Sequence, residues 1–161
     1  MNSKKLLDWL YPRRCAFCDE VLGSMEKYLC HSCRRRMPKP IGEPNCKKCG
    51  KPLLREEQEY CYDCMHTHHY YERGLSLWNH KNPVNQSVYQ FKYHNQRRYG
   101  ILYSQELVKE FQKEIERWRP DIIMPVPLHP SRKRKRGYNQ AELLARELSG
   151  RSGIPVDKSL L

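Results

Sequence analysis

The sequence lacks any long apolar run. No stretch approaches the roughly 18 to 20 consecutive apolar residues that a membrane-spanning helix requires. Residues 1–14 carry two lysines ahead of a short apolar run, but Asp8 interrupts that run and no small-residue cleavage site follows. We therefore expect no membrane span and no secretory signal, a short amphipathic helix within residues 1–14, and a cytoplasmic location.

Cysteine is absent after Cys64, although the first 64 residues hold eight of them. That first segment contains few aliphatic residues, so it cannot bury a sizeable core and needs another source of stability. The rest of the chain has the composition of an ordinary α/β domain. The contrast predicts two domains, with a boundary between residues 68 and 69.

The cysteines form an internal repeat. Two CxxC pairs separated by eleven residues occur twice, and each cysteine of the second set lies 31 positions after its counterpart. A tight CxxC turn aims two sulfur atoms at one ion, so two such turns complete a tetrahedral site. The repeat predicts two zinc ribbons with structural zinc, whose ligands are Cys15, Cys18, Cys30 and Cys33 in the first and Cys46, Cys49, Cys61 and Cys64 in the second.

Several alternatives remain open at this point. Disulfides are disfavoured by the missing secretory signal, and four CxxC pairs exceed what one dithiol exchanger needs. No CxxC is followed by histidine, which excludes haem attachment. Iron in place of zinc and an interleaved pairing of the cysteines both fit the spacing. The nearby histidines are expected to be solvated or to support the ligands: His31, His66, His68 and His69.

Acidic residues are too few to balance the basic ones. The formal net charge is +12, and eight thiolates with two zinc ions would leave about +8. A basic chain favours polyanionic partners such as nucleic acid, phosphorylated metabolites or an anionic membrane surface.

Residues 69–161 alternate between strand and helix patterns. We expect a strand at 70–80, a helical turn after Pro83 that Gly100 could end, and a helix from Ser104 to Trp118. A buried strand is expected at 122–128, and a helix from Asn139 or Gln140 to Glu147 or Leu148. A further strand could begin at 154. The order strand, helix, strand predicts a βαβ unit with a parallel sheet.

Five consecutive cations, Arg132 to Arg136, follow the predicted strand at 122–128, and Gly137 comes next. In open parallel sheets ligands bind beyond the carboxyl ends of the strands. The segment 129–136 is therefore a candidate pyrophosphate loop. A mobile solvated loop and a sequence-tolerant nucleic-acid contact are the alternatives.

Three features occur in order along the chain: two CxxC ribbons, then Pro125-Val126-Pro127-Leu128, and, after a basic spacer, Arg136-Gly137-Tyr138-Asn139-Gln140. In this combination the chain resembles the ComF or ComFC family of competence proteins. The resemblance covers most of the chain. Tyr138 stands where the family more often has phenylalanine. The resemblance implies a double zinc ribbon at 1–68 and, at 69–161, the first part of a Rossmann-like core of the type I phosphoribosyltransferase class. It also implies a pyrophosphate loop that contains Leu128, His129, Ser131, Arg132, Arg136 and Gly137.

The family's decisive element is a pair of adjacent acidic residues followed by a Thr-Thr-Gly loop, which together hold phosphoribosyl pyrophosphate. In these 161 residues no two aspartates are adjacent and no Thr-Thr-Gly loop occurs. The resemblance therefore leaves open whether the chain is an enzyme. Phosphoribosyl pyrophosphate with Mg²⁺ is expected to bind only a complete protein.

The resemblance further implies a role in the uptake of single-stranded DNA during natural transformation. Expected partners are single-stranded DNA and a competence helicase or the DNA-uptake machinery, at the inner face of the membrane. We also expect self-association through an incomplete sheet. The alternative is a zinc-ribbon nucleic-acid-binding or adaptor module without catalytic activity.

Overall fold

The computed structural model describes residues 11–160. Most of the segment 1–14, where an amphipathic helix is expected, lies outside this range. The chain divides into two compact units, one formed by residues 1–37 and 85–161 and the other by residues 38–84. The predicted domain boundary between residues 68 and 69 stays a prediction. None of the helices in the described range is long and apolar enough to cross a membrane.

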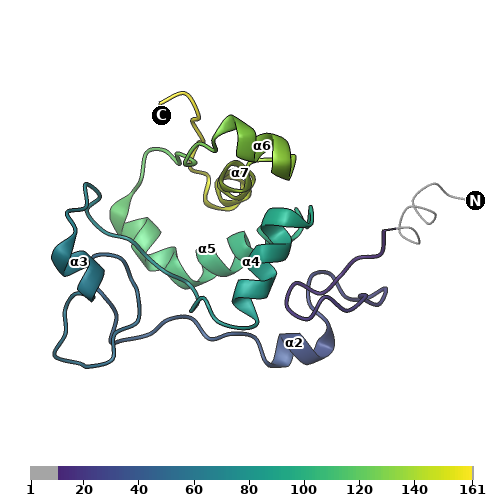
Figure 1. The fold of residues 1–161 in the computed structure, drawn as a ribbon, viewed down its shortest axis with the longest axis horizontal. Helices are drawn as coiled ribbons and strands as arrows, with labels where there is room; N and C mark the ends of the chain where they lie inside the picture. The colour runs from purple at the N-terminus through teal and green to yellow at the C-terminus, as the bar shows by residue number, and fades with distance from the viewer. Residues whose placement is uncertain (1–10, 161) are drawn as a thin grey trace, which may run out of the picture. The chain divides into compact units, whose positions relative to one another are not determined.

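Regular structure in residues 11–160 is helical (Figure 1). No strand forms in this range, where β-pairing is limited to three isolated bridges. The helices are α2 (His31–Arg35), α3 (Tyr62–His66), α4 (Val84–Tyr93), α5 (Tyr99–Trp118), α6 (Pro130–Arg136) and α7 (Gln140–Ser152).

Helices α4 to α7 surround an aromatic core. The Phe91 ring of α4 packs edge-on against Tyr103 of α5 at 5.3 Å and against Tyr138 at 5.9 Å. The Tyr103 hydroxyl is 2.6 Å from the Ser87 hydroxyl, so this buried polar pair satisfies itself. The Tyr138 hydroxyl donates a hydrogen bond to the Phe91 carbonyl. These contacts connect the loop between α6 and α7 to α4.

Helix α5 begins earlier than the sequence indicates. Ser104 is not an N-cap but lies inside the helix, where its hydroxyl contacts the Ile101 carbonyl and accepts a hydrogen bond from Arg151 of α7. Gly100 does not end a turn either. It is buried, and a Cβ atom there would lie 2.3 Å from the Leu143 side chain of α7. The glycine therefore permits the close approach of α5 and α7.

The strand predicted at 70–80 is absent, because this segment pairs with the second ribbon instead of with a sheet. Within the unit of residues 38–84, the Gly74 N–H donates to the Lys48 carbonyl at 2.6 Å, and the Leu77 carbonyl accepts from Ile41 at 2.9 Å. The Ser76 hydroxyl donates to the Cys49 carbonyl at 3.0 Å. These single contacts satisfy backbone groups without forming a ladder.

The strand predicted at 122–128 is represented by one parallel bridge. Ile123 donates to the Pro155 carbonyl at 2.8 Å and accepts from the Asp157 N–H at 3.1 Å, which places residue 123 opposite Val156. The bridge joins the two segments that the sequence predicts to pair in parallel around α6 and α7. A sheet is not formed, since the prolines of 122–128 cannot donate to a ladder.

Candidate metal centres and basic surfaces

The sequence repeat is also a structural repeat. The antiparallel bridge between Arg14 and Val21 has its counterpart, 31 residues later, between Asn45 and Pro52. The Cys15 N–H donates to the Glu20 carbonyl at 2.8 Å, and the Cys46 N–H donates to the Lys51 carbonyl at the same distance. Each first CxxC pair therefore sits in a hairpin turn, and each second pair lies at the start of α2 or α3.

Eight thiols gather in two groups of four. Within each group the four sulfur atoms lie within 4.8 Å of one another. The sulfur atoms of Cys18 and Cys30 are 3.6 Å apart, and those of Cys49 and Cys61 are 3.8 Å apart. A tetrahedral zinc with Zn–S bonds of about 2.3 Å separates its sulfur ligands by about 3.8 Å. The groups are Cys15, Cys18, Cys30 and Cys33, and Cys46, Cys49, Cys61 and Cys64. Both are compatible with a structural zinc ion.

Backbone N–H groups already point at these sulfur atoms. The Cys30 N–H donates to the Cys15 sulfur at 3.4 Å, and the Cys61 N–H donates to the Cys46 sulfur at 3.3 Å. Burial raises the pKa of Cys46, but backbone N–H groups of Cys61, Cys49 and Lys48 outweigh burial and lower that pKa to about 6. The turn therefore favours a thiolate before any ion binds.

Burial raises the pKa of four other thiols, those of Cys18, Cys33, Cys49 and Cys64. Burial, followed by the neighbouring thiols of Cys49 and Cys61, raises the pKa of Cys64 to about 12. Four thiolates in one group would repel one another, and a divalent cation removes that penalty. The described candidate groups consist of cysteines alone. His31, His66, His68 and His69 are not members of them.

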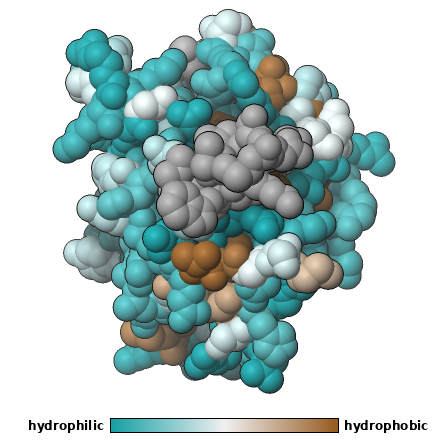
Figure 2. Space-filling view, turned by 90° about the vertical axis from the view of Figure 1, so that its right-hand side faces the viewer, coloured by the Kyte–Doolittle hydropathy of each residue, from teal (hydrophilic) through white to brown (hydrophobic). Residues whose placement is uncertain are grey.

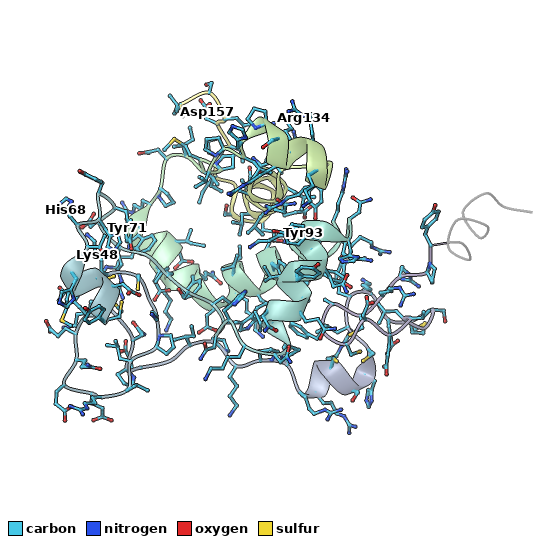
Figure 3. All side chains as sticks on the ribbon, viewed as in Figure 1. Lys48, His68, Tyr71, Tyr93, Arg134 and Asp157 are labelled. Carbon is cyan, nitrogen blue, oxygen red and sulfur yellow. The ribbon has the colours of Figure 1, made fainter. Side chains whose placement is uncertain are left out.

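The second ribbon has a further close contact. Gly50 follows Cys49 with φ +72°, and a Cβ atom there would lie 2.8 Å from the Ser76 backbone nitrogen. Asp19 occupies the equivalent position of the first ribbon with φ 61°. Lys48 lies 5.3 Å from the centre of the exposed Tyr71 ring, and both are labelled in Figure 3.

The five-cation segment is a helix, not a loop. Pro130 starts α6, the His129 ring nitrogen accepts from the Ser131 N–H at 3.3 Å, and Gly137 ends the helix with φ 75°. Proline in the first turn, a capping acceptor before it and a left-handed glycine after it are ordinary helix boundaries. The side chains of Arg132 to Lys135 are exposed, and Arg134 on α6 is labelled in Figure 3.

Residues 136–140 connect α6 and α7 to α4. Arg136 stacks on Tyr93 at 4.9 Å and donates to the Tyr93 hydroxyl at 3.0 Å. It also donates to Gln140 at 3.1 Å, and buried Gln140 donates to the Lys92 carbonyl at 3.3 Å. Asn139 accepts from the Ala141 and Glu142 N–H groups and caps α7. This segment therefore contacts α4 and caps α7 within the fold.

The structure separates the candidate pyrophosphate-loop residues into two groups. His129 and Ser131 lie together at the start of α6, and Arg136 and Gly137 lie at its end. Leu128 precedes the helix and is half-buried, whereas Arg132 is exposed.

Sequence reasoning missed a cleft of about 540 Å³ between the first ribbon and the connection from α4 to α5. Its lining includes Arg13, Arg14, Lys27, Arg97 and Arg98. The doublets at 13–14 and 97–98 are the signal in the sequence, but they are separated by more than 80 residues. Hydrophilic residues predominate on the face in Figure 2, and apolar ones form small patches.

Comparison with known proteins agrees with this arrangement. Residues 6–65 match the family of double zinc ribbon domains, so this segment is a double zinc ribbon. Most of the chain is also similar to several curated proteins, including the following three. Competence protein F of Haemophilus influenzae is 28% identical over 88% of this chain and 62% of its own length. Competence protein ComFC of Bacillus subtilis is 25% identical over 81% of this chain and 55% of its own length. DNA utilization protein YhgH of Escherichia coli K12 is 26% identical over 86% of this chain and 61% of its own length.

These similarities confirm the predicted resemblance to the ComF-type competence proteins. The chain spans between about half and two thirds of the length of these relatives. No solved structure matches it.

Proposed function

We propose that this chain acts in DNA uptake and handling as a protein of the ComF type, and that it binds single-stranded DNA. The similarity to proteins named for competence and DNA utilization over most of the chain carries this proposal. The net charge of +12 supports it, because a polyanionic strand is the partner that such a charge favours.

The two groups of four cysteines each hold one structural zinc ion in this proposal. The sulfur spacing and the N–H groups directed at Cys15 and Cys46 support zinc as the resident ion. Closed sites with four thiolates leave no position for substrate, so zinc stabilises the ribbons and takes no part in catalysis. Its binding supplies folding free energy to residues 1–68.

Residues 69–161 are proposed to form the first part of a phosphoribosyltransferase-like α/β domain. The parallel bridge of Ile123 with Val156 around α6 and α7 supports this fold. In a complete protein, the segment from Leu128 to Gly137 would face the pyrophosphate of phosphoribosyl pyrophosphate, with Mg²⁺ as its counterion. Exposed Arg132 is available for that contact, whereas the Ser131 hydroxyl lies 2.7 Å from the His129 ring nitrogen.

An adaptor without catalytic activity is the second candidate. One observation favours it: Arg136 already stacks on Tyr93 and donates to Gln140, so its guanidinium is committed within the fold.

The partners proposed for both candidates, the enzyme-like protein and the adaptor, are a helicase or other DNA-uptake components at the inner face of the membrane. Self-association is proposed as well, because apolar side chains are exposed at the end of α5 and in the segment after it. The exposed fraction is 44% for Trp118 and 72% for Val126.

Ligand-induced stabilisation separates the two candidates. Phosphoribosyl pyrophosphate with Mg²⁺ should raise the melting temperature of an enzyme-like form, whereas pyrophosphate alone should raise it less. An adaptor would respond to neither, and its affinity for single-stranded DNA would fall steeply with salt. Absence of DNA binding by the folded, zinc-loaded chain would contradict the proposed function.

A further inference from the structure

The positive charge is concentrated in one of the two compact units. Residues 38–84 contain seven Lys and Arg against six Asp and Glu, whereas the remainder of the chain contains 23 against 12. A partner attracted by charge is therefore directed to the unit that contains the first ribbon and helices α5 to α7.

Within that unit, two clefts share one residue. The cleft of about 540 Å³ lies between the first ribbon and the connection from α4 to α5, and a second cleft of about 280 Å³ lies beside the loop from α6 to α7. Arg97 lines both. The two clefts therefore meet at Arg97, and their cations come from three distant parts of the chain.

The cations of these clefts are not equally available. Arg13 donates to the carbonyls of Glu26 and Ser24, and Arg14 donates to the Asp19 carbonyl at 2.8 Å. Arg97 donates to the Asn95 side chain at 2.8 Å and lies 4.8 Å from the centre of the Tyr138 ring. Lys27 and Arg98 are exposed, and neither has a side-chain partner among residues 11–160. We call Lys27, Arg97, Arg98 and Lys133 the basic track.

Negative charge on this surface is already neutralised. Glu142 is the acidic residue that lines the smaller cleft. Its carboxylate is 2.7 Å from Arg146 and 2.5 Å from Lys158. No acidic side chain of the described residues lines the larger cleft. An incoming phosphate would therefore meet cations without competition from a free carboxylate.

Exposed aromatic rings border the track. The Tyr89 side chain on α4 is 55% exposed, and its ring lies 5.0 Å from Tyr93 and 5.5 Å from His94, which lines the larger cleft. Arg136 fixes Tyr93 by stacking and a hydrogen bond. Figure 3 labels Tyr93 at the end of α4. A fixed, exposed ring beside cations is suited to stacking an unpaired base while its phosphate is neutralised.

We propose that the basic track is the binding surface for single-stranded nucleic acid. Lys27 and Arg98 contact successive phosphates, Arg97 adds positive charge where the two clefts meet, and Tyr89 with Tyr93 stacks bases. The inference rests on the proposed function, because it assigns the position of the DNA contact made by the first compact unit. Aromatic stacking favours a single strand, since the bases of a duplex are stacked on one another and not accessible.

The test compares two double variants that remove the same charge. Lys27→Gln/Arg98→Gln alters the track, and Lys109→Gln/Lys113→Gln alters exposed lysines of α5. Fluorescence anisotropy would measure binding of a labelled oligothymidylate of about 20 nucleotides, long enough for one or more binding modules. We expect the track variant to bind about tenfold more weakly, with a log–log salt slope smaller by about 1.4, because each lost phosphate contact removes about 0.7.

Tyr89 provides an independent measurement. Tyr89→Ala should weaken oligonucleotide binding by about fivefold or more, and Tyr89→Phe should retain it, because stacking depends on the ring and not on the hydroxyl. Zinc content and circular dichroism would establish that each variant is folded. A duplex of the same length should bind more weakly than the single strand.

Three results would overturn the assignment. Equal affinities of the track and α5 variants would place the DNA contact elsewhere while leaving the proposed function intact. Complete displacement of the oligonucleotide by an equimolar amount of pyrophosphate would identify a small-anion site. Unchanged DNA binding with loss of binding to anionic vesicles would identify a membrane contact. Failure of the unaltered chain to bind any oligonucleotide would instead contradict the proposed function.

Discussion

The Tyr99 hydroxyl donates a hydrogen bond to the Cys15 carbonyl at 3.1 Å, although 84 residues separate the two in sequence. Both residues are buried, with exposed fractions of 2% and 0%. The bond connects the first turn of α5 to the first cysteine of the first ribbon. The first metal site and the helical core are therefore parts of one packed unit.

Tyr99→Phe should lower the free energy of unfolding by about 1 to 2 kcal/mol, because it leaves the buried Cys15 carbonyl without this donor. Urea unfolding followed by circular dichroism would measure the change. Tyr70→Phe is the matched control, since Tyr70 is 97% exposed. Equal unfolding midpoints for the two variants would show that the bond contributes nothing to stability.

The two metal sites should respond differently to removal of one ligand. Cys46→Ser and Cys15→Ser should each reduce the zinc content from two ions to one, since three thiolates no longer close a tetrahedral site. Cys15→Ser should in addition destabilise the helical unit, because loss of the ion loosens the turn whose Cys15 carbonyl accepts the Tyr99 hydrogen bond. Native mass spectrometry would count the ions, and thermal unfolding would compare the variants. Retention of two ions after either substitution would contradict the grouping.

Gly50→Ala should destabilise the second ribbon by more than about 1 kcal/mol, because its positive φ and the nearby Ser76 backbone both oppose a Cβ atom. Gly42→Ala is the control, since a Cβ atom at Gly42 meets nothing within 4 Å. Competition with a chelator would reveal a weaker second site in Gly50→Ala alone. Identical chelator resistance would refute this account.

Stability should fall as the pH rises above about 10. Burial raises the pKa of Tyr103 and of Tyr138 above the ordinary tyrosine value of about 10. The folded state therefore holds these protons more tightly than the unfolded state, so their contribution is complete below pH 10 and is lost as the pH rises through the folded-state values. Melting temperatures measured at pH values below and above 10 would test this loss of stability, and tyrosinate absorbance would follow the titration of the tyrosines. Ordinary titration of every tyrosine in the folded chain would contradict the burial effect.

Arg136→Ala should lower the melting temperature, whereas Arg132→Ala should not. Arg136 contacts Tyr93 and Gln140, and Arg132 is exposed on α6. The free energy of unfolding is expected to fall by about 1.5 to 3 kcal/mol in Arg136→Ala, as for the loss of a hydrogen bond from a charged group. Equal melting temperatures would show that residue 136 is free for a ligand.

Features that depend on nearby residues could be predicted from the sequence. The 31-residue repeat indicates two four-cysteine groups, because a CxxC turn is fixed by its own few residues. The Asn139 cap of α7 is predictable for the same reason, whereas the helix continues to Ser152, beyond the predicted end at residue 147 or 148. The resemblance to ComF-type proteins also depended on contiguous motifs.

Features that depend on distant partners could not be predicted. Residues 70–80 have the composition of a strand, but their backbone groups pair with Lys48 and Ile41. Gly100 looks like a helix terminator, yet it is buried against Leu143. The family resemblance places Arg136 in a phosphate loop, but its contact with Tyr93 crosses 43 residues.

The sequence by itself determined that two four-thiol sites organise the N-terminal segment, because cysteine spacing and turn geometry are local properties. Only the tertiary structure decided that Cys15 packs against Tyr99 and that Lys27 lines the same cleft as Arg97 and Arg98. The physical reason is that a buried hydrogen bond or a shared cleft depends on which surfaces meet after folding, and the meeting surfaces leave no periodic signal along the chain.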